Sequence, residues 1–150
     1  MGYYLGMVLL LVLDQVTKIW AVNNLMGKSA STLIPGILGL RYTENTGAAF
    51  SILRDKQLLL ILLTAVIIVG LMGYMVKAMR TDTHFVVKIS YMLLISGAIG
   101  NLIDRVRLNY VIDFLEFKFI QFPIFNIADV CVVVGVSLLA IATVFLKYDF

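Results

Sequence analysis

Four long apolar stretches dominate the chain, and more polar segments separate them. The stretches cover about residues 3–22, 58–76, 88–104 and 129–147. A helix that crosses a bilayer needs roughly 20 predominantly apolar residues. Because the bilayer core offers the backbone no water, each stretch is predicted to be a transmembrane α-helix.

The segments between the apolar stretches differ in length, and this predicts a topology. Residues 77–88 form a short turn, whereas residues 23–57 and 105–128 are long connections. With four spans, both chain ends lie on the same side of the membrane as the short turn. The two long segments then share the opposite side, and residues 1–150 are expected to form a single integral membrane domain.

The two long segments carry signals of strands and turns. Residues 23–57 include Pro35, Gly36 and an alternation of apolar and polar positions over residues 38–43. Residues 109–114 combine a turn with an extended piece. These patterns predict short strands beside the helical bundle.

The composition supports lipid as the solvent for much of the surface. Hydrophobic residues make up 61% of the chain, charged residues 14%, and the mean hydropathy is +1.00. A soluble domain is about 45–50% apolar and about 25% charged. Disorder is excluded, because disordered chains have low hydropathy and high charge. The net charge of +3 includes no long basic run, so no nucleic-acid partner is expected.

A single cysteine, Cys131, and a single histidine, His84, limit the chemistry of any site. A Cys/His zinc site needs several such ligands, so neither a metal nor another cofactor is predicted. A serine or cysteine nucleophile needs a histidine partner. His84 lies in the short turn, on the wrong side for such a partnership with the polar residues described next.

The remaining polar residues gather on the side of the two long segments. An ionisable residue at the bilayer centre costs about 2.5–3.5 kcal/mol on insertion scales, so such placements are informative. Asp14 and Lys18 share a helix face at i, i+4 spacing. The same side of the membrane holds Asn45, Asn101, Asp104, Arg105, Asp113, Asn126 and Asp129. Together they predict a cleft that opens on one face of a bundle.

Several of these residues also have a purely structural interpretation. Asp14 and Lys18 have the spacing of an intrahelical ion pair. Asn126 and Asp129 have the spacing of a helix N-cap with an acidic third residue. Asp113 stands in an apolar stretch and has the weakest structural explanation. The confinement of all of them to one side favours a functional site.

Carboxylates are the only catalytic groups left for such a site. Two neighbouring carboxyl groups cannot both ionise easily, so one holds a proton while the other acts as a base on water. Such a pair hydrolyses an amide without metal or cofactor. The candidates are Asp14, Asp104, Asp113 and Asp129, and the pattern alone does not choose among them.

Five sequence blocks resemble one known family, the bacterial lipoprotein signal peptidases or signal peptidase II. They are DQVTK at 14–18, NTGAAFS at 45–51, GAIGNLIDR at 97–105, VIDF at 111–114 and FPIFNIAD at 122–129. One block alone is a weak signal. Five blocks in this order, combined with four spans, are highly specific and extend over nearly the whole chain.

The resemblance implies an aspartic endopeptidase that removes the signal peptide from diacylglyceryl-modified prolipoproteins by cleaving before the lipidated cysteine. The family's catalytic aspartates map to Asp113 and Asp129. The resemblance places the other motif residues in substrate binding or in support of the catalytic pair, with Asp104 ranked third as a catalyst. These supporting residues are Asp14, Lys18, Asn45, Gly47, Asn101, Asp104, Arg105 and Asn126.

The resemblance also implies an architecture and a location. It implies an all-α membrane bundle of four transmembrane helices with a small extracytoplasmic β-cradle formed by residues 23–57. It places the chain in the bacterial cytoplasmic membrane, with cytoplasmic termini and with lipids and prolipoproteins as partners. We expect a monomer. Positive charge opposes this orientation, because four basic residues lie on the terminal side and seven on the other. Asn109 stands where the family has a turn glycine, and asparagine tolerates left-handed geometry.

Two other functions fit four spans with polar residues. A small transporter could use Asp14 as a coupling carboxylate, although transporter sites usually lie near the membrane midplane. A purely structural membrane protein would tolerate Asp113→Asn with a change in stability alone.

Overall fold

Four helices form the body of the molecule in a computed structural model that describes residues 2–47 and 55–148. They are α1 (Gly2–Leu25), α2 (Gln57–Arg80), α3 (Phe85–Leu108) and α4 (Ile127–Phe145). Each is long and apolar enough to cross a membrane. Together with the small sheet described below, they confirm the predicted fold class.

The helices overlap the predicted spans but have different ends. The first three are longer than predicted, and α4 begins two residues earlier and ends two residues earlier than the stretch 129–147. Hydropathy marks the charge-free part of a span, whereas the helix continues as long as its backbone hydrogen bonds can form. Thus α3 runs past Asp104 and ends at Leu108. Its C-cap is Asn109, whose φ of 63° is left-handed and whose N–H donates to Arg105 O.

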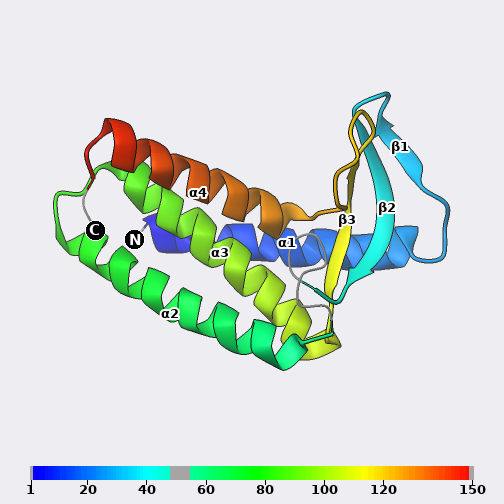
Figure 1. The fold of residues 1–150 in the computed structure, drawn as a ribbon, viewed down its shortest axis with the longest axis horizontal. Helices are drawn as coiled ribbons and strands as arrows, with labels where there is room; N and C mark the ends of the chain where they lie inside the picture. Colours follow the sequence, from blue (N-terminus) through cyan, green and yellow to red (C-terminus); the bar gives the residue numbers. More distant parts are fainter. Residues whose placement is uncertain (1, 48–54, 149–150) are drawn as a thin grey trace.

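The third helix is the centre of the bundle. It packs against each of the other three helices and has the largest buried share of the four (Figure 1). Glycine permits this closeness at Gly97, where an added Cβ would lie 2.4 Å from the backbone oxygen of Ala128 in α4. The outer faces of α1, α2 and α4 expose many large apolar side chains, as a lipid environment requires.

A three-stranded antiparallel sheet stands at one end of the bundle. Its order is β1 (Ser31–Ile34), β2 (Leu38–Asn45) and β3 (Val111–Phe117). The sheet rests on the end of α1 through a buried apolar cluster that includes Ala21 and Phe114. The register pairs Thr43 with Asp113, so two segments far apart in sequence meet at one place.

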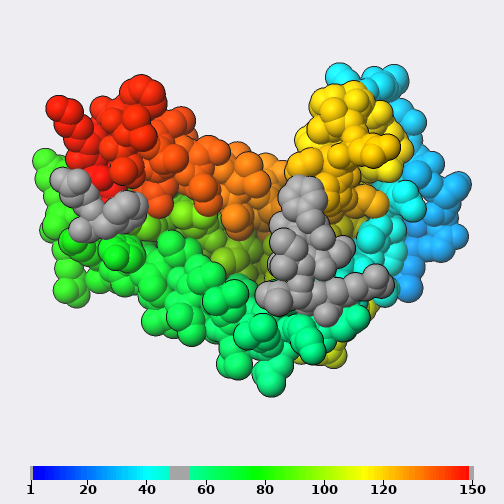
Figure 2. All heavy atoms as spheres, viewed as in Figure 1, coloured from blue at the N-terminus to red at the C-terminus, as the bar shows by residue number. Residues whose placement is uncertain are grey.

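The beginning of α1 and the end of α4 lie at the opposite end of the bundle from the sheet (Figure 1). The turn between α2 and α3 lies at that end too, as the number of spans predicts. The polar residues singled out in the sequence therefore lie at the sheet end. Figure 2 shows that the surface is hollowed there, between α4 and the loop that follows β3.

Candidate active site

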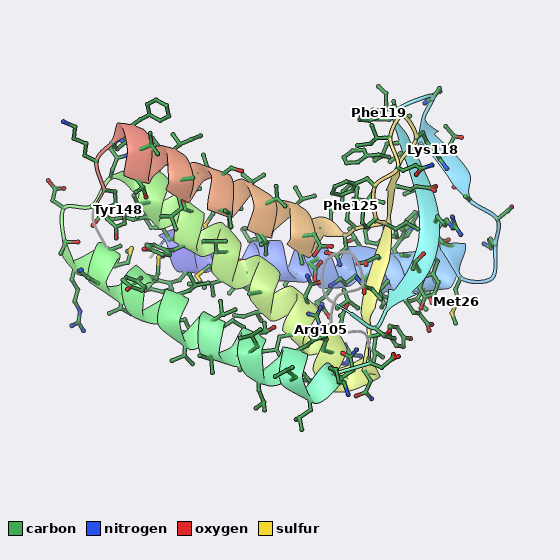
Figure 3. All side chains as sticks on the ribbon, viewed as in Figure 1. Met26, Arg105, Lys118, Phe119, Phe125 and Tyr148 are labelled. Atoms are coloured by element: carbon green, nitrogen blue, oxygen red, sulfur yellow. The ribbon has the colours of Figure 1, made fainter. Side chains whose placement is uncertain are left out.

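A cavity of about 760 Å³ opens at the sheet end of the bundle. Residues from β2, α3, β3, α4 and the loop before α4 line it. Its polar side includes Asn45, Asn101, Arg105, Asp113 and Asp129. Its apolar side includes Phe117, Phe122, Pro123, Phe125, Val130 and Val133. The cavity thus brings two acids to the edge of an apolar surface, with Phe125 and Arg105 on different sides (Figure 3).

Strand β3 carries Asp113 into this cavity. The side chain is 2% exposed, so its polar atoms need partners inside the protein. Asn45 Nδ2 donates to its Oδ2 at 3.0 Å, and Asn126 Nδ2 donates to its Oδ1 at 2.7 Å. The orientation of Asn45 is set in turn, because Gly47 N donates to Asn45 Oδ1 at 3.0 Å.

The first turn of α4 presents Asp129. Asn126 is the N-cap, and the two residues form both halves of a capping box, which confirms the structural interpretation of their spacing. Asn126 N donates to Asp129 Oδ2 at 3.1 Å, and Asn101 Nδ2 donates to Asp129 Oδ1 at 2.8 Å. Asn126 therefore contacts both carboxyl groups of the cavity.

The environment of Asp113 favours its protonated form. Burial raises the pKa of Asp113 to about 7, and the negative charge of Asp129 acts in the same direction. Hydrogen bonds from Asn45 and Asn126 and the charge of Lys18 oppose this rise in pKa. Burial therefore disfavours the charged form of the Asp113 carboxyl group.

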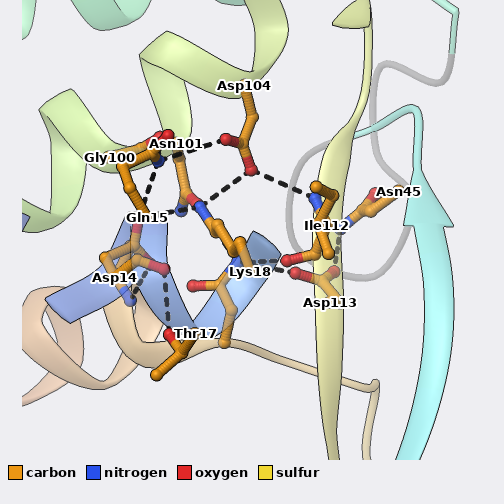
Figure 4. Close-up of polar contacts among 12 residues, drawn as sticks. Asp14, Gln15, Thr17, Lys18, Asn45, Gly100, Asn101, Asp104, Ile112 and Asp113 are labelled. Atoms are coloured by element: carbon orange, nitrogen blue, oxygen red, sulfur yellow. Dashed lines mark hydrogen bonds and ion pairs between the residues drawn. The ribbon is translucent and has the colours of Figure 1, made fainter. Parts of the chain in front are cut away.

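Lys18 gathers the other two acids and keeps them apart from this pair. Its Nζ lies 3.0 Å from Asp14 Oδ2 and 2.9 Å from Asp104 Oδ2, and all three side chains are buried (Figure 4). The predicted ion pair of Asp14 and Lys18 is thus confirmed. Asp14 and Asp104 are both paired with Lys18 and are not among the residues that line the cavity, so they are poorer candidates for a base than Asp113 and Asp129.

Asp14 and Asp104 also hold the two elements that carry the cavity acids. Asp14 Oδ1 accepts the backbone N–H of Ala128 at 3.0 Å, next to Asp129 in α4. Asp104 Oδ2 accepts the backbone N–H of Ile112 at 3.2 Å, next to Asp113 in β3. The ion cluster therefore ties α1 and α3 to both acid-bearing elements.

Arg105 completes the polar side of the cavity. It is 8% exposed, and its Nη2 donates to Gly47 O at 3.1 Å. This contact joins the third sequence block to the second. Residues 48–51 of the second block lie outside the described residues.

The structure brings together all ten residues that the sequence singled out, and it adds others. Gln15 was missed, although it lies in the first block. Its Nε2 contacts Asp14 Oδ2 at 3.1 Å, Asp104 Oδ1 at 3.2 Å and Gly100 O at 3.3 Å. The aromatic wall of Phe117, Phe122 and Phe125 was also missed, since apolar residues give no chemical signal in so apolar a chain.

The position of the acids bears on the other functions considered. A transporter site is expected near the membrane midplane. The cavity acids Asp113 and Asp129 lie instead beside the sheet, in β3 and in the first turn of α4. Asp14, the carboxylate considered for a transporter, is paired with Lys18 and is not among the residues that line this cavity. Within residues 2–47 and 55–148, no three His, Cys, Asp or Glu side chains are placed to hold a metal ion.

Comparison with known proteins matches the chain to one family over most of its length. A sequence model of the family described as Signal peptidase (SPase) II matches residues 6–145. Two similar proteins, from Streptococcus pyogenes serotype M5 (strain Manfredo) and serotype M18 (strain MGAS8232), are each named lipoprotein signal peptidase. Each is 43% identical over 141 residues, which cover 93% of this chain and 90% of the relative.

Two solved structures share the fold. Both are described as bacterial membrane enzymes determined by the in meso method, at 2.3 Å and 1.9 Å resolution. The first has a TM-score of 0.86 and 31% identity, and covers 99% of this chain and 93% of its own. The second has a TM-score of 0.83 and 32% identity, and covers 96% and 93%. The match includes the sheet as well as the helices.

Proposed function

The chain belongs to the signal peptidase II family, and we propose that the cavity lined by Asp113 and Asp129 is its active centre. The family confirms the resemblance noted in the sequence. The reaction is removal of signal peptides from prolipoproteins. The observation that carries the proposed centre is the pair of buried carboxyl groups on one cavity, both hydrogen-bonded to Asn126.

Hydrolysis by two carboxyl groups divides the proton transfers between them. One aspartate removes a proton from water, and the water oxygen attacks the carbonyl carbon of the peptide bond. The other aspartate protonates the carbonyl oxygen. Breakage of the C–N bond then requires a proton on the leaving nitrogen, which the pair supplies. In this proposal the enzyme is therefore an aspartic endopeptidase.

The remaining polar residues hold the pair or the substrate. Asn45, Asn101 and Asn126 donate to the carboxyl groups and keep them in place. Arg105 lines the cavity next to Gly47 and is positioned to bind carbonyl oxygens of the substrate backbone. The cluster around Lys18 braces the elements that carry the acids.

The apolar side of the cavity fits a substrate that remains anchored in lipid. Val130 and Val133 line the cavity and are 40% and 64% exposed on α4. The lipid chains of a diacylglyceryl cysteine can thus stay in the bilayer while the peptide before that cysteine enters the cavity. We place this end of the bundle at the extracytoplasmic surface, with both termini in the cytoplasm and the chain acting as a monomer.

The test of the active centre is loss of cleavage without loss of fold. Asp113→Asn and Asp129→Asn each remove a group that transfers protons, so each is expected to lower cleavage of a diacylglyceryl prolipoprotein by at least about 100-fold. Purified variants in micelles are assayed by the gel shift of the product, and their helical content is measured by circular dichroism.

Asp82→Asn, in the exposed turn at the far end of the bundle, is the matched control and retains cleavage. The same assay with an unlipidated prolipoprotein is expected to give no product. Cleavage at the normal rate by either cavity variant rules out the pair as the catalytic groups.

A further inference from the structure

The ammonium group of Lys18 has a partner for each of its hydrogens. Besides Asp14 and Asp104, it donates to Asn101 Oδ1 at 3.0 Å. An ammonium has three hydrogens, so these contacts use all of them. Lys18 is 1% exposed and makes no direct hydrogen bond to either cavity acid among the described contacts. Its charge acts on both acids from a distance, but its hydrogen bonds can affect the catalytic pair only through a neighbour.

Asn101 is that neighbour, because it stands between Lys18 and Asp129. Its Oδ1 accepts from Lys18 Nζ at 3.0 Å and from Asn126 Nδ2 at 3.1 Å. Its Nδ2 donates to Asp129 Oδ1 at 2.8 Å. A half-turn of this amide would place its hydrogens against two donors and its oxygen against a carboxylate. The ammonium and the second amide therefore fix which end of Asn101 faces Asp129.

Both carboxyl oxygens of Asp129 therefore face hydrogen-bond donors whose orientation is fixed. Asn101 Nδ2 donates to Oδ1, and the backbone N–H of Asn126 donates to Oδ2. A proton on either oxygen would weaken the hydrogen bond that this oxygen accepts, because a protonated carboxyl oxygen is a poorer acceptor. Hydrogen bonds of this kind favour the ionised form of a carboxyl group.

Asn45 Nδ2 donates to Asp113 Oδ2 at 3.0 Å, and the second donor to this acid is shared with other acceptors. Asn126 Nδ2 faces Asp113 Oδ1 at 2.7 Å, but also Ile112 O at 3.2 Å and Asn101 Oδ1 at 3.1 Å. The two hydrogens of Asn126 Nδ2 are shared among three acceptors. Protonation of Asp113 therefore costs less hydrogen-bond energy than protonation of Asp129.

Resting on the active centre proposed above, we propose that Lys18 is a positioning residue that acts through Asn101 to keep Asp129 ionised. Asp129 is then the base, and Asp113 carries the proton that goes to the substrate. The raised pKa of Asp113, about 7, agrees with this division.

The proton transfers balance under this assignment. Asp129 takes a proton from water as the water oxygen bonds to the carbonyl carbon, and Asp113 gives its proton to the carbonyl oxygen. When the C–N bond breaks, Asp129 gives its proton to the nitrogen. The hydroxyl proton returns to Asp113 as the new carboxyl group forms, and the pair is restored.

Other charged and titratable groups act on Asp129 from each neighbouring element. They are Asp14 and Lys18 in α1, Arg105 in α3, Asp113 in β3 and Cys131 in α4 itself. The charge of Lys18 is already more than balanced by two carboxylates, Asp14 and Asp104. Loss of Lys18 is therefore expected to act chiefly by releasing the amide of Asn101.

The experiment compares pH profiles of kcat for Lys18→Met, Asn101→Leu and the double variant, using a diacylglyceryl prolipoprotein in micelles. Each single change is expected to move the acid limb upward by about one pH unit, because Asp129 loses a fixed donor. At pH values on the acid side of the limb, kcat of each single variant is expected to be about tenfold lower than that of the wild type, while KM changes little. The double variant is expected to be no worse than Asn101→Leu.

Gln15→Met is the matched control. Gln15 contacts the same two acids as Lys18, but its hydrogen bonds reach neither Asn101 nor Asp129. This variant tests the stability of the ion cluster and is expected to leave the acid limb in place. Lys18→Arg retains a cationic donor and is also expected to keep the limb, even if the protein is less stable.

Additive effects in the double variant, an unmoved acid limb, or a limb that moves downward each overturn the proposal. If Lys18→Met fails to fold, Asn101→Leu and Lys18→Arg still decide, because the first must shift the limb and the second must not. Active Asp113→Asn or Asp129→Asn variants would instead remove the proposed active centre itself. The two failures are therefore distinguishable.

Discussion

Asn126 serves a helix and a pair of acids with one side chain. Its Oδ1 accepts the N–H of Asp129 at 2.9 Å as an N-cap, and its Nδ2 donates to Asp113 at 2.7 Å. The cap uses the oxygen end of the amide, so the nitrogen end has to face Asp113. Local spacing predicts the cap, but only the folded chain places Asp113 within reach.

The buried carboxyl of Asp113 makes stability depend on pH. Its pKa rises from 3.8 to about 7 on folding, so between these values the folded state binds more protons than the unfolded state. Stability therefore falls as the pH rises from about 4 to 7, by up to about 4 kcal/mol from this group. Reversible unfolding in mixed micelles at a series of pH values measures this slope.

Asp113→Asn is expected to flatten that slope, because the amide does not titrate. Asp82→Asn retains the slope, since Asp82 lies in an exposed turn at the far end. A wild-type protein whose stability rises through this pH range contradicts the assigned environment of Asp113.

Helices α1, α3 and α4 meet at a point where no side chain fits on α3. A Cβ on Gly100 would lie 2.5 Å from Asp14 Oδ2 and 3.3 Å from Ala128 Cβ. Asp14 in turn accepts the N–H of Ala128 at 3.0 Å. The contact between these elements thus depends on a missing methyl group.

Gly100→Ala is expected to push Asp14 away from α4 and to lower the free energy of unfolding by about 1–3 kcal/mol. Cleavage activity falls with it, because Asp129 is carried by the displaced helix. Denaturation in mixed micelles and the cleavage assay measure the two effects.

Gly70→Ala is the control for this substitution, because nothing lies within 4 Å of a Cβ built there. It is expected to change the free energy of unfolding by no more than about 1 kcal/mol. Equal effects of the two substitutions contradict the packing argument.

Elements were predictable where one local property decides them. Apolar length predicts the four spans, and the spacing of Asp14 and Lys18 predicts their ion pair. The helix ends were less predictable, because α3 continues past Asp104 and Arg105 once those charges find partners. The pairing of Asp104 with Lys18 joins two helices, and no local pattern contains that information.

The molecule gathers its buried charged side chains towards the sheet end of the bundle. The sheet end also carries exposed apolar side chains, such as Phe119 at the tip beyond β3 (Figure 3). The seven basic residues counted on this side include Arg105, which is buried in the site. A count of positive charge therefore overestimates how far this side favours the cytoplasm.

Labelling of single cysteines tests the proposed orientation. In a Cys131→Ala background, Lys28→Cys and Asp82→Cys place exposed thiols at opposite ends of the bundle. A membrane-impermeant maleimide is expected to label position 28 in intact cells and to reach position 82 only after lysis. The reverse result contradicts cytoplasmic termini.

The apolar wall that Val130 and Val133 form at the cavity has a kinetic consequence for an enzyme of this kind. Partners that approach sideways through a lipid film meet in two dimensions, so their encounter rate depends on copies per unit area. Fusion with empty lipid vesicles is therefore expected to slow the reaction, because the same amounts of enzyme and substrate are spread over a larger membrane area. The rate of processing in a cell then depends on the number of enzyme and substrate molecules per unit area of membrane. At a constant surface density, this rate does not change with cell volume.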